Sequence, residues 1–85
     1  MNSLFTTNAW SDYLALQRAD LGLLLRVNDL LTAIMENPTK GPGQPEALHG
    51  VFGGCWTRRI DARHRLIYRV EGQTVIVLSC QDHAA

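Results

Sequence analysis

No apolar run in this sequence approaches the ~20 residues that a helix needs to span a bilayer. The N-terminal region also lacks the order of basic and then apolar residues that marks a secretory signal. We therefore expect a cytoplasmic protein that makes no contact with membranes. At 85 residues, the chain is expected to form one domain over residues 1–85, with a compact core.

The sequence also lacks an excess of charge of either sign. Eight lysine and arginine residues balance eight acidic ones, so no global field would draw the protein to nucleic acid. The charge is nevertheless uneven, because five arginines fall close together: Arg58, Arg59, Arg63, Arg65 and Arg69. Such a cluster is typical of a phosphate-binding patch and, equally, of a solvated face. Any affinity for RNA must therefore be local.

Cysteine is scarce, and its two positions suit neither a bridge nor a metal site. Cys55 and Cys80 are expected at opposite ends and on opposite faces of their strands, too far apart for a disulfide. The three histidines, His49, His64 and His83, lack metal-ligand spacing among themselves or with the cysteines. We expect two free thiols, no metal and no cofactor.

Two helices are expected in the N-terminal half. Asn8 is a suitable N-cap for a helix that ends near Ala19. Asp20 is suited to cap a second helix, in which leucine, valine and isoleucine recur every three or four residues until Asn37-Pro38 ends it. These two elements predict a helical hairpin.

After an irregular loop at residues 38–45, the hydrophobic period changes to two, which predicts a β-sheet. A short edge strand is also expected before the first helix, at residues 4–6. The fold class is therefore α+β, with the N-terminal helical hairpin packed on a twisted antiparallel sheet. The strands that follow the loop are expected at residues 47–52, 55–60, 64–70 and 74–80.

Short turns between the last three strands predict an antiparallel meander, whose register follows from the turn lengths. With three-residue turns, Trp56 lies opposite Tyr68, and Tyr68 lies opposite Ile76. This register gathers the bulky residues on one face of the sheet. It places Val75 and Val77 on the other face, together with most of the clustered arginines.

The same meander brings three chemically active residues to one rim of the sheet. Arg59 lies near the end of one strand, Arg65 at the start of the next, and His83 just past the end of the last. Arg58 has the parity of the apolar face and would have to leave the sheet at an edge. Side chains far apart in the sequence are thus expected within reach of one phosphate.

These residue types suit the cleavage of RNA. The reaction requires a base for the ribose 2′-hydroxyl, cations to hold the charge of the phosphorane, and an acid for the leaving 5′-oxygen. Glu46, Arg65 with Arg59, and His83 fit those roles, and an imidazole can give and take a proton near neutrality. Each also has a simpler interpretation as a solvated side chain, and Arg65 as one half of a surface ion pair with a nearby aspartate.

Four segments, Gly43–Leu48, Trp56–Ile60, His64–Tyr68 and Cys80–His83, resemble the YoeB/Txe branch of the RelE/ParE superfamily. Members of this family are the toxins of bacterial type II toxin–antitoxin pairs. The resemblance implies a RelE-like, microbial-RNase-like fold and cleavage of messenger RNA in the A site of the 70S ribosome. It implies Glu46 as base, Arg65 as phosphate clamp and His83 as acid, with Arg58, Arg59, Gln44 and His49 as substrate-binding residues.

The resemblance also implies partners. Antitoxins of the YefM type insert an acidic, disordered tail at the site, and we expect the apolar residues beside the arginines, Ile67, Val75 and Val77, to receive such a tail. A homodimer is a further expectation from the family.

The sequence departs from the family at its end, because Ala84 and Ala85 follow His83 where the family usually closes with tyrosine. Loss of that ring would weaken stacking on an RNA base and reduce activity. Two alternatives stay open. One is a non-enzymatic poison of DNA gyrase, like the ParE proteins, and the other is a weakened homologue that acts through antitoxin binding.

Overall fold

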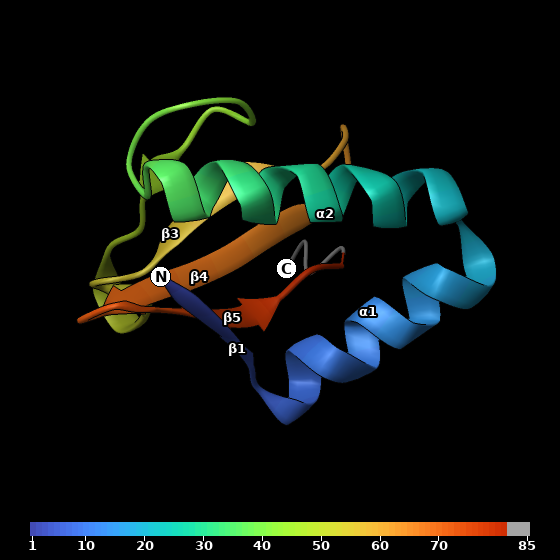
Figure 1. The fold of residues 1–85 in the computed structure, drawn as a ribbon, viewed down its shortest axis with the longest axis horizontal. Coiled ribbons are helices and arrows are strands. Elements are labelled where there is room, and N and C mark those ends of the chain that lie inside the picture. Colours follow the sequence, from blue (N-terminus) through green and yellow to red (C-terminus); the bar gives the residue numbers. More distant parts are fainter. Residues whose placement is uncertain (82–85) are drawn as a thin grey trace.

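The computed structural model describes residues 1–81, which form two helices and a five-stranded sheet (Figure 1). Within these residues, neither helix is long and apolar enough to cross a membrane. The predicted α+β class with an N-terminal helical hairpin is confirmed. Along the chain the elements are β1 (Asn2–Phe5), α1 (Thr7–Ala19), α2 (Leu21–Glu36), β2 (Glu46–Ala47), a 3₁₀ turn (Gly50–Phe52), β3 (Trp56–Arg59), β4 (Arg65–Glu71) and β5 (Thr74–Ser79).

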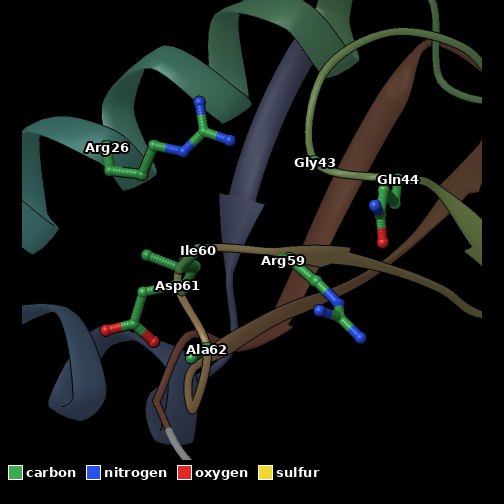
Figure 2. A pocket seen from close by; sticks show the side chains of 7 residues that line it. All are labelled: Arg26, Gly43, Gln44, Arg59, Ile60, Asp61 and Ala62. Atoms are coloured by element: carbon green, nitrogen blue, oxygen red, sulfur yellow. The ribbon is translucent and has the colours of Figure 1, made fainter.

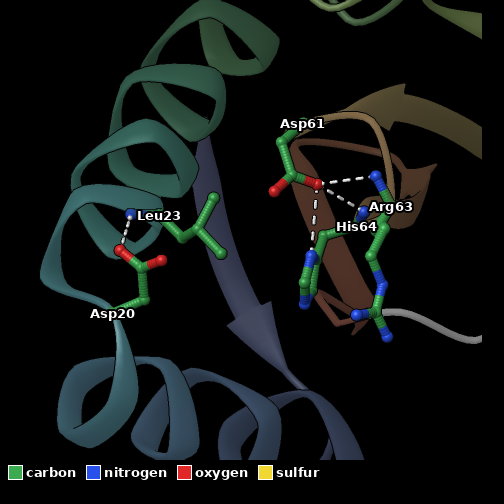
Figure 3. Close-up of polar contacts among 5 residues, drawn as sticks. All are labelled: Asp20, Leu23, Asp61, Arg63 and His64. Carbon is green, nitrogen blue, oxygen red and sulfur yellow. Dashed lines mark hydrogen bonds and ion pairs between the residues drawn. The ribbon is translucent and has the colours of Figure 1, made fainter.

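Side-chain caps fix where the two helices begin. The Thr6 hydroxyl accepts a hydrogen bond from the backbone N–H of Ala9 (3.1 Å), so the predicted cap at Asn8 is wrong by two residues. Asn8 instead donates to a backbone carbonyl of β5 (3.1 Å). Asp20 caps α2 as predicted, because its carboxylate accepts from the N–H of Leu23 (3.1 Å; Figure 3). The chain therefore reverses direction at a single capping residue.

The sheet has the order β1-β5-β4-β3-β2 and is mixed, not antiparallel throughout as predicted. β1 runs parallel to β5, with Asn2 opposite Thr74 and Phe5 opposite Val77. A parallel pair requires a long connection between its strands, and here the helical hairpin lies within that connection. The predicted short N-terminal strand is confirmed at the edge of the sheet, where it covers the backbone of β5.

β2 is shorter than the strand predicted at residues 47–52. Only Glu46 and Ala47 pair with β3. Gly50 then adopts a φ of 70° and begins the 3₁₀ turn, which ends the extended backbone. Glu46, predicted in the loop before the strand, is thus held within it.

The register between β4 and β5 differs from the predicted one. The turn contains two residues, 72–73, with Gly72 at a φ of 58°, because a tight hairpin turn requires a positive φ. Tyr68 therefore lies opposite Val77 and not opposite Ile76. The register of β3 and β4 is as predicted, with Trp56 opposite Tyr68.

A slip of one residue exchanges the two faces of a strand, so the prediction for Val75 and Val77 is wrong. Both side chains are fully buried in the core and cannot receive a peptide on the surface. An irregularity in the register between Ile67 and Tyr68 then brings Ser79 opposite Ile67. Ser79 therefore lies on the face that carries the arginines.

The two faces of the sheet are distinct. On the covered face, Tyr68, Leu66 and Val77 join α2 residues such as Leu30 and Ile34 in one buried cluster, and Figure 1 shows α2 lying across the strands. We call the opposite face the helix-free face. Cross-strand pairing places on it Glu46, Thr57, Arg59, Arg65, Ile67, Arg69, Ile76 and Ser79.

Candidate functional site

Two arginines lie directly opposite each other on the helix-free face. Arg59, at the end of β3, and Arg65, at the start of β4, are register partners, as predicted, and both side chains are exposed. Side chains directly opposite have Cβ atoms about 5 Å apart, a separation at which like charges repel. Within residues 1–81, neither guanidinium has a hydrogen bond or an ion pair. Their proximity therefore destabilises the fold unless an anion binds.

Glu46 lies on the same face, one row further along the sheet. It pairs with Thr57, two residues before Arg59, which places the two rows about 7 Å apart along the strands. The carboxylate is exposed and forms no ion pair with another described residue. One carboxylate and two cations thus lie on the same face of the sheet, in two rows about 7 Å apart along the strands.

A hollow of about 450 Å³ borders this site, where α2, the loop before β2 and the β3–β4 turn meet. Figure 2 shows Arg26 reaching from α2 toward the loop, whereas Arg59 and Gln44 extend from the other side of the hollow. Arg26 is half-buried and, in the described part of the chain, unpaired. The hollow is lined by Arg26, Gly43, Gln44, Arg59, Ile60, Asp61 and Ala62.

Asp61 organises the turn between β3 and β4 (Figure 3). One carboxylate oxygen accepts from the backbone N–H groups of Arg63 (2.8 Å) and His64 (2.6 Å) and lies 3.1 Å from Nδ1 of His64. The backbone hydrogen bond from His64, assisted by the other contacts, lowers the pKa of Asp61. Because Asp61 serves the turn, it is not the ion-pair partner of Arg65.

Arg58 does not leave the sheet at an edge, as its parity had suggested, but is completely buried. Its Nε donates to the Tyr68 hydroxyl (3.1 Å). Its Nη1 donates to the carbonyl of Pro42 (3.1 Å), and its Nη2 donates to those of Asn37 (2.7 Å) and Lys40 (3.1 Å). These contacts hold the loop before β2. A guanidinium so enclosed presents no donor to a substrate, so we remove Arg58 from the substrate-binding set.

Both cysteines are buried and free. Burial, and then the charge of Asp12, raise the pKa of Cys80 to about 12, so this thiol stays protonated near neutrality and is no nucleophile. Asp12 also accepts from the backbone N–H of Cys80 (3.1 Å), which ties α1 to the end of β5. Within residues 1–81, no cluster of histidine, cysteine and acidic side chains could hold a metal ion.

The structure brings only part of the predicted set together. Glu46, Arg59 and Arg65 share one face, and Gln44 lines the adjoining hollow. His49 is exposed beyond β2, outside the paired strands. His83, the predicted acid, and Ala84 lie outside the described residues.

Sequence reasoning missed Arg26 and Tyr68. Arg26 is next to buried Val27 on α2, but nothing in the helical pattern indicates that this turn of the helix meets the loop. Tyr68 did carry a signal, because its hydroxyl on the apolar face requires a partner. Arg58, whose parity puts it on the same face, is that partner.

The described residues thus combine an α+β fold with one exposed carboxylate and two exposed arginines on the same face of the sheet. Residues 5–84 match the family described as the YoeB-like toxin of bacterial type II toxin–antitoxin systems. The chain is 41% identical over 83 residues to Toxin YoeB of Synechocystis sp., covering 98% of this chain and 96% of the relative. The chain therefore belongs to the YoeB-like toxin family, whose members are endoribonucleases.

Solved structures of the same family have the same fold as this chain. The YoeB/ParE toxin from Agrobacterium tumefaciens aligns with a TM-score of 0.95 at 40% identity, covering 98% of this chain and 99% of that one. The heterotetrameric YoeB–YefM complex from Staphylococcus aureus aligns with a TM-score of 0.91 at 34% identity, covering 98% and 97%. A YoeB dimer from the same organism gives 0.90 at 34% identity with the same coverage.

Proposed function

We propose that this toxin is a ribosome-dependent endoribonuclease that cuts messenger RNA in the A site. The observation that best supports this proposal is the cross-strand pair of Arg59 and Arg65 beside Glu46. A like-charged pair without an acidic partner is unfavourable. An RNA phosphate binds such a pair through charge-assisted hydrogen bonds and removes the repulsion.

In the proposed reaction, Glu46 takes the proton of the ribose 2′-hydroxyl, and the 2′-oxygen attacks the adjacent phosphorus. The new P–O2′ bond closes a 2′,3′-cyclic phosphate while the P–O5′ bond breaks. Arg65, with Arg59, holds the charge that develops on the non-bridging oxygens. His83, as inferred from the sequence, gives its proton to the leaving 5′-oxygen.

The RNA on either side of the cut is bound, in this proposal, by groups around the same face. Gln44 and Arg26 line the hollow, where an amide and a guanidinium can contact a phosphate or a base edge. His49 lies beyond β2 and would contact the RNA or the ribosome on that side. The set replaces the predicted one by exchanging Arg58 for Arg26.

The partner we propose is a cognate antitoxin of the YefM type, supported by the solved YoeB–YefM complex. An acidic tail of such an antitoxin would neutralise Arg59 and Arg65 and fold on binding. The solved YoeB dimer supports a homodimer of this chain. We place the toxin in the cytoplasm, where its ribosomal substrate is found, and treat residues 1–85 as one toxin domain.

Primer extension on a defined messenger RNA, with and without 70S ribosomes, tests the proposal. Glu46→Ala and Arg65→Ala are expected to lower the cleavage rate by about 10² to 10⁴. Arg69→Ala is the matched control, because Arg69 lies on the same face but is paired with Glu71 (2.6 Å). Its rate should stay close to that of the parent.

Three results would contradict the proposal or part of it. Cleavage without ribosomes would remove the ribosome dependence, and full activity of Glu46→Ala would remove the base. Intact messenger RNA together with inhibited DNA supercoiling would favour the gyrase alternative. The same assay with Ala84→Tyr tests whether the toxin's activity is reduced by the missing tyrosine, because a restored ring should speed cleavage if it stacks on the RNA.

A further inference from the structure

Arg58 is buried on the covered face and has no acidic partner among residues 1–81. Arg58 is 0% exposed, and its hydrogen bonds run to the Tyr68 hydroxyl and to three backbone carbonyls, not to a carboxylate. Burying a charge is costly unless hydrogen bonds satisfy it. A core that needed only stability would be served as well by an apolar side chain. The arginine must therefore provide something that hydrocarbon cannot, and its contacts indicate what that is.

All three carbonyls belong to one segment, the loop at residues 37–42 that follows α2. Tyr68 adds a fourth contact to the same segment, because its hydroxyl donates to the carbonyl of Pro38 (2.6 Å) while accepting from Arg58. The guanidinium carbon lies 5.9 Å from the centre of the Tyr68 ring. Side chains from β3 and β4 thus hold a loop that has no regular structure of its own.

That loop leads directly into the strand that carries Glu46. Gly43 leaves no room for a side chain, because a Cβ there would lie 2.9 Å from Leu30 Cδ2 and 3.1 Å from Arg58 Cβ. The carbonyl of Gly43 accepts a short bond from the N–H of Arg59 (2.6 Å). Gln44 follows in a left-handed conformation (φ 53°), and Glu46 then pairs with β3. Few residues separate the held loop from the proposed base.

We propose that Arg58 and Tyr68 are positioning residues: they hold the loop before β2 and thereby set the place of Glu46 against Arg59 and Arg65. This inference rests on the proposed function. Neither side chain touches the substrate, since both lie on the covered face. Their effect on cleavage passes through the loop to the carboxylate, and displacement of a reacting group by about 1 Å can cost up to 10²-fold in rate.

A double-mutant cycle with Tyr68→Phe and Glu46→Ala separates this role from a general loss of stability. Tyr68→Phe keeps the ring and removes only the hydroxyl that holds Pro38 and Arg58. We expect single-turnover cleavage on ribosomes to slow about 10-fold, with KM nearly unchanged. In the Glu46→Ala background, the same change should have no further effect, because the group being positioned is gone. Arg58→Lys should behave like Tyr68→Phe.

Val75→Ala is the matched control, because Val75 is equally buried but lies on β5, away from the loop. It should lower the melting temperature and leave the cleavage rate of the folded protein unchanged. Full activity of Tyr68→Phe overturns the inference, as does an equal loss in both backgrounds, which would place its role elsewhere. If Glu46→Ala itself cleaves normally, the proposed base fails instead, so the two failures are distinguishable.

Discussion

Arg58 and Arg59 are neighbours in the sequence, yet they belong to two regions governed by opposite rules. On the covered face, Arg58 is buried and its donors meet carbonyls and a hydroxyl. On the helix-free face, Arg59 is exposed, unpaired among the described residues and opposite another arginine. Alternation along a strand divides the two. In β3, the side chain of Arg58 forms hydrogen bonds within the fold, whereas that of Arg59 forms none with the described residues.

The buried hydroxyls repeat this contrast. On the covered face, the Tyr68 hydroxyl both donates and accepts. On the helix-free face, Thr57 Oγ1 and Ser79 Oγ are buried without a hydrogen-bond partner in the described part of the chain. Polar groups left unsatisfied in this way lower stability. The two faces therefore differ in how well their buried hydroxyls are satisfied.

The largest effect is expected for a change on the covered face. Leu16→Ala should lower the free energy of unfolding by about 2 to 5 kcal/mol, because Leu16 on α1 is buried in the core and lies away from the loop before β2. Denaturant unfolding measures the loss. Cleavage per folded molecule should stay unchanged at a temperature where the variant is folded. A large loss of rate with intact stability would break the division between the faces.

Arg59→Gln should show the reverse pattern. The free energy of unfolding should stay constant or rise slightly, since the change removes the repulsion with Arg65. On the proposed function, cleavage should fall about 10- to 100-fold, because one cation is lost from the charge-stabilising pair. Arg18→Gln, at an exposed site on α1, is the control in both assays. A clearly destabilised Arg59→Gln would show that this face also serves the fold.

The smallest effect is expected for the turn that joins β3 and β4. The pKa of Asp61 is lowered in the folded state, chiefly by the backbone N–H of His64, so its carboxylate stabilises the fold above the unfolded pKa. That contribution is lost as the pH falls through the folded pKa. Asp61→Asn should therefore be less stable than the parent near neutrality and nearly equal to it at low pH. Thermal unfolding of the parent and of Asp61→Asn between about pH 7 and pH 2 measures whether their stabilities converge. A stability difference that stays constant over this range would contradict the prediction.

Apart from the start of α1, the sequence alone was sufficient for the two helices, the β3–β4 register and the pairing of Arg59 with Arg65, because each follows from local period and turn length. It was insufficient for β5, where one residue more or fewer in a turn exchanges Val75 and Ile76 between faces. It also could not place Arg58, whose partners are loop carbonyls that leave no trace in a hydrophobic pattern. The role of His83 stays a prediction.

The parallel pairing of β1 with β5 has a consequence for the order in which the protein forms. Residues 2–5 are synthesised well before residues 74–77, which are their partners in the sheet. The sheet therefore cannot be completed until almost all of this sequence has been translated, and its contacts are slow to form because they are distant in the chain. The fold of this toxin is therefore completed only late in its own translation.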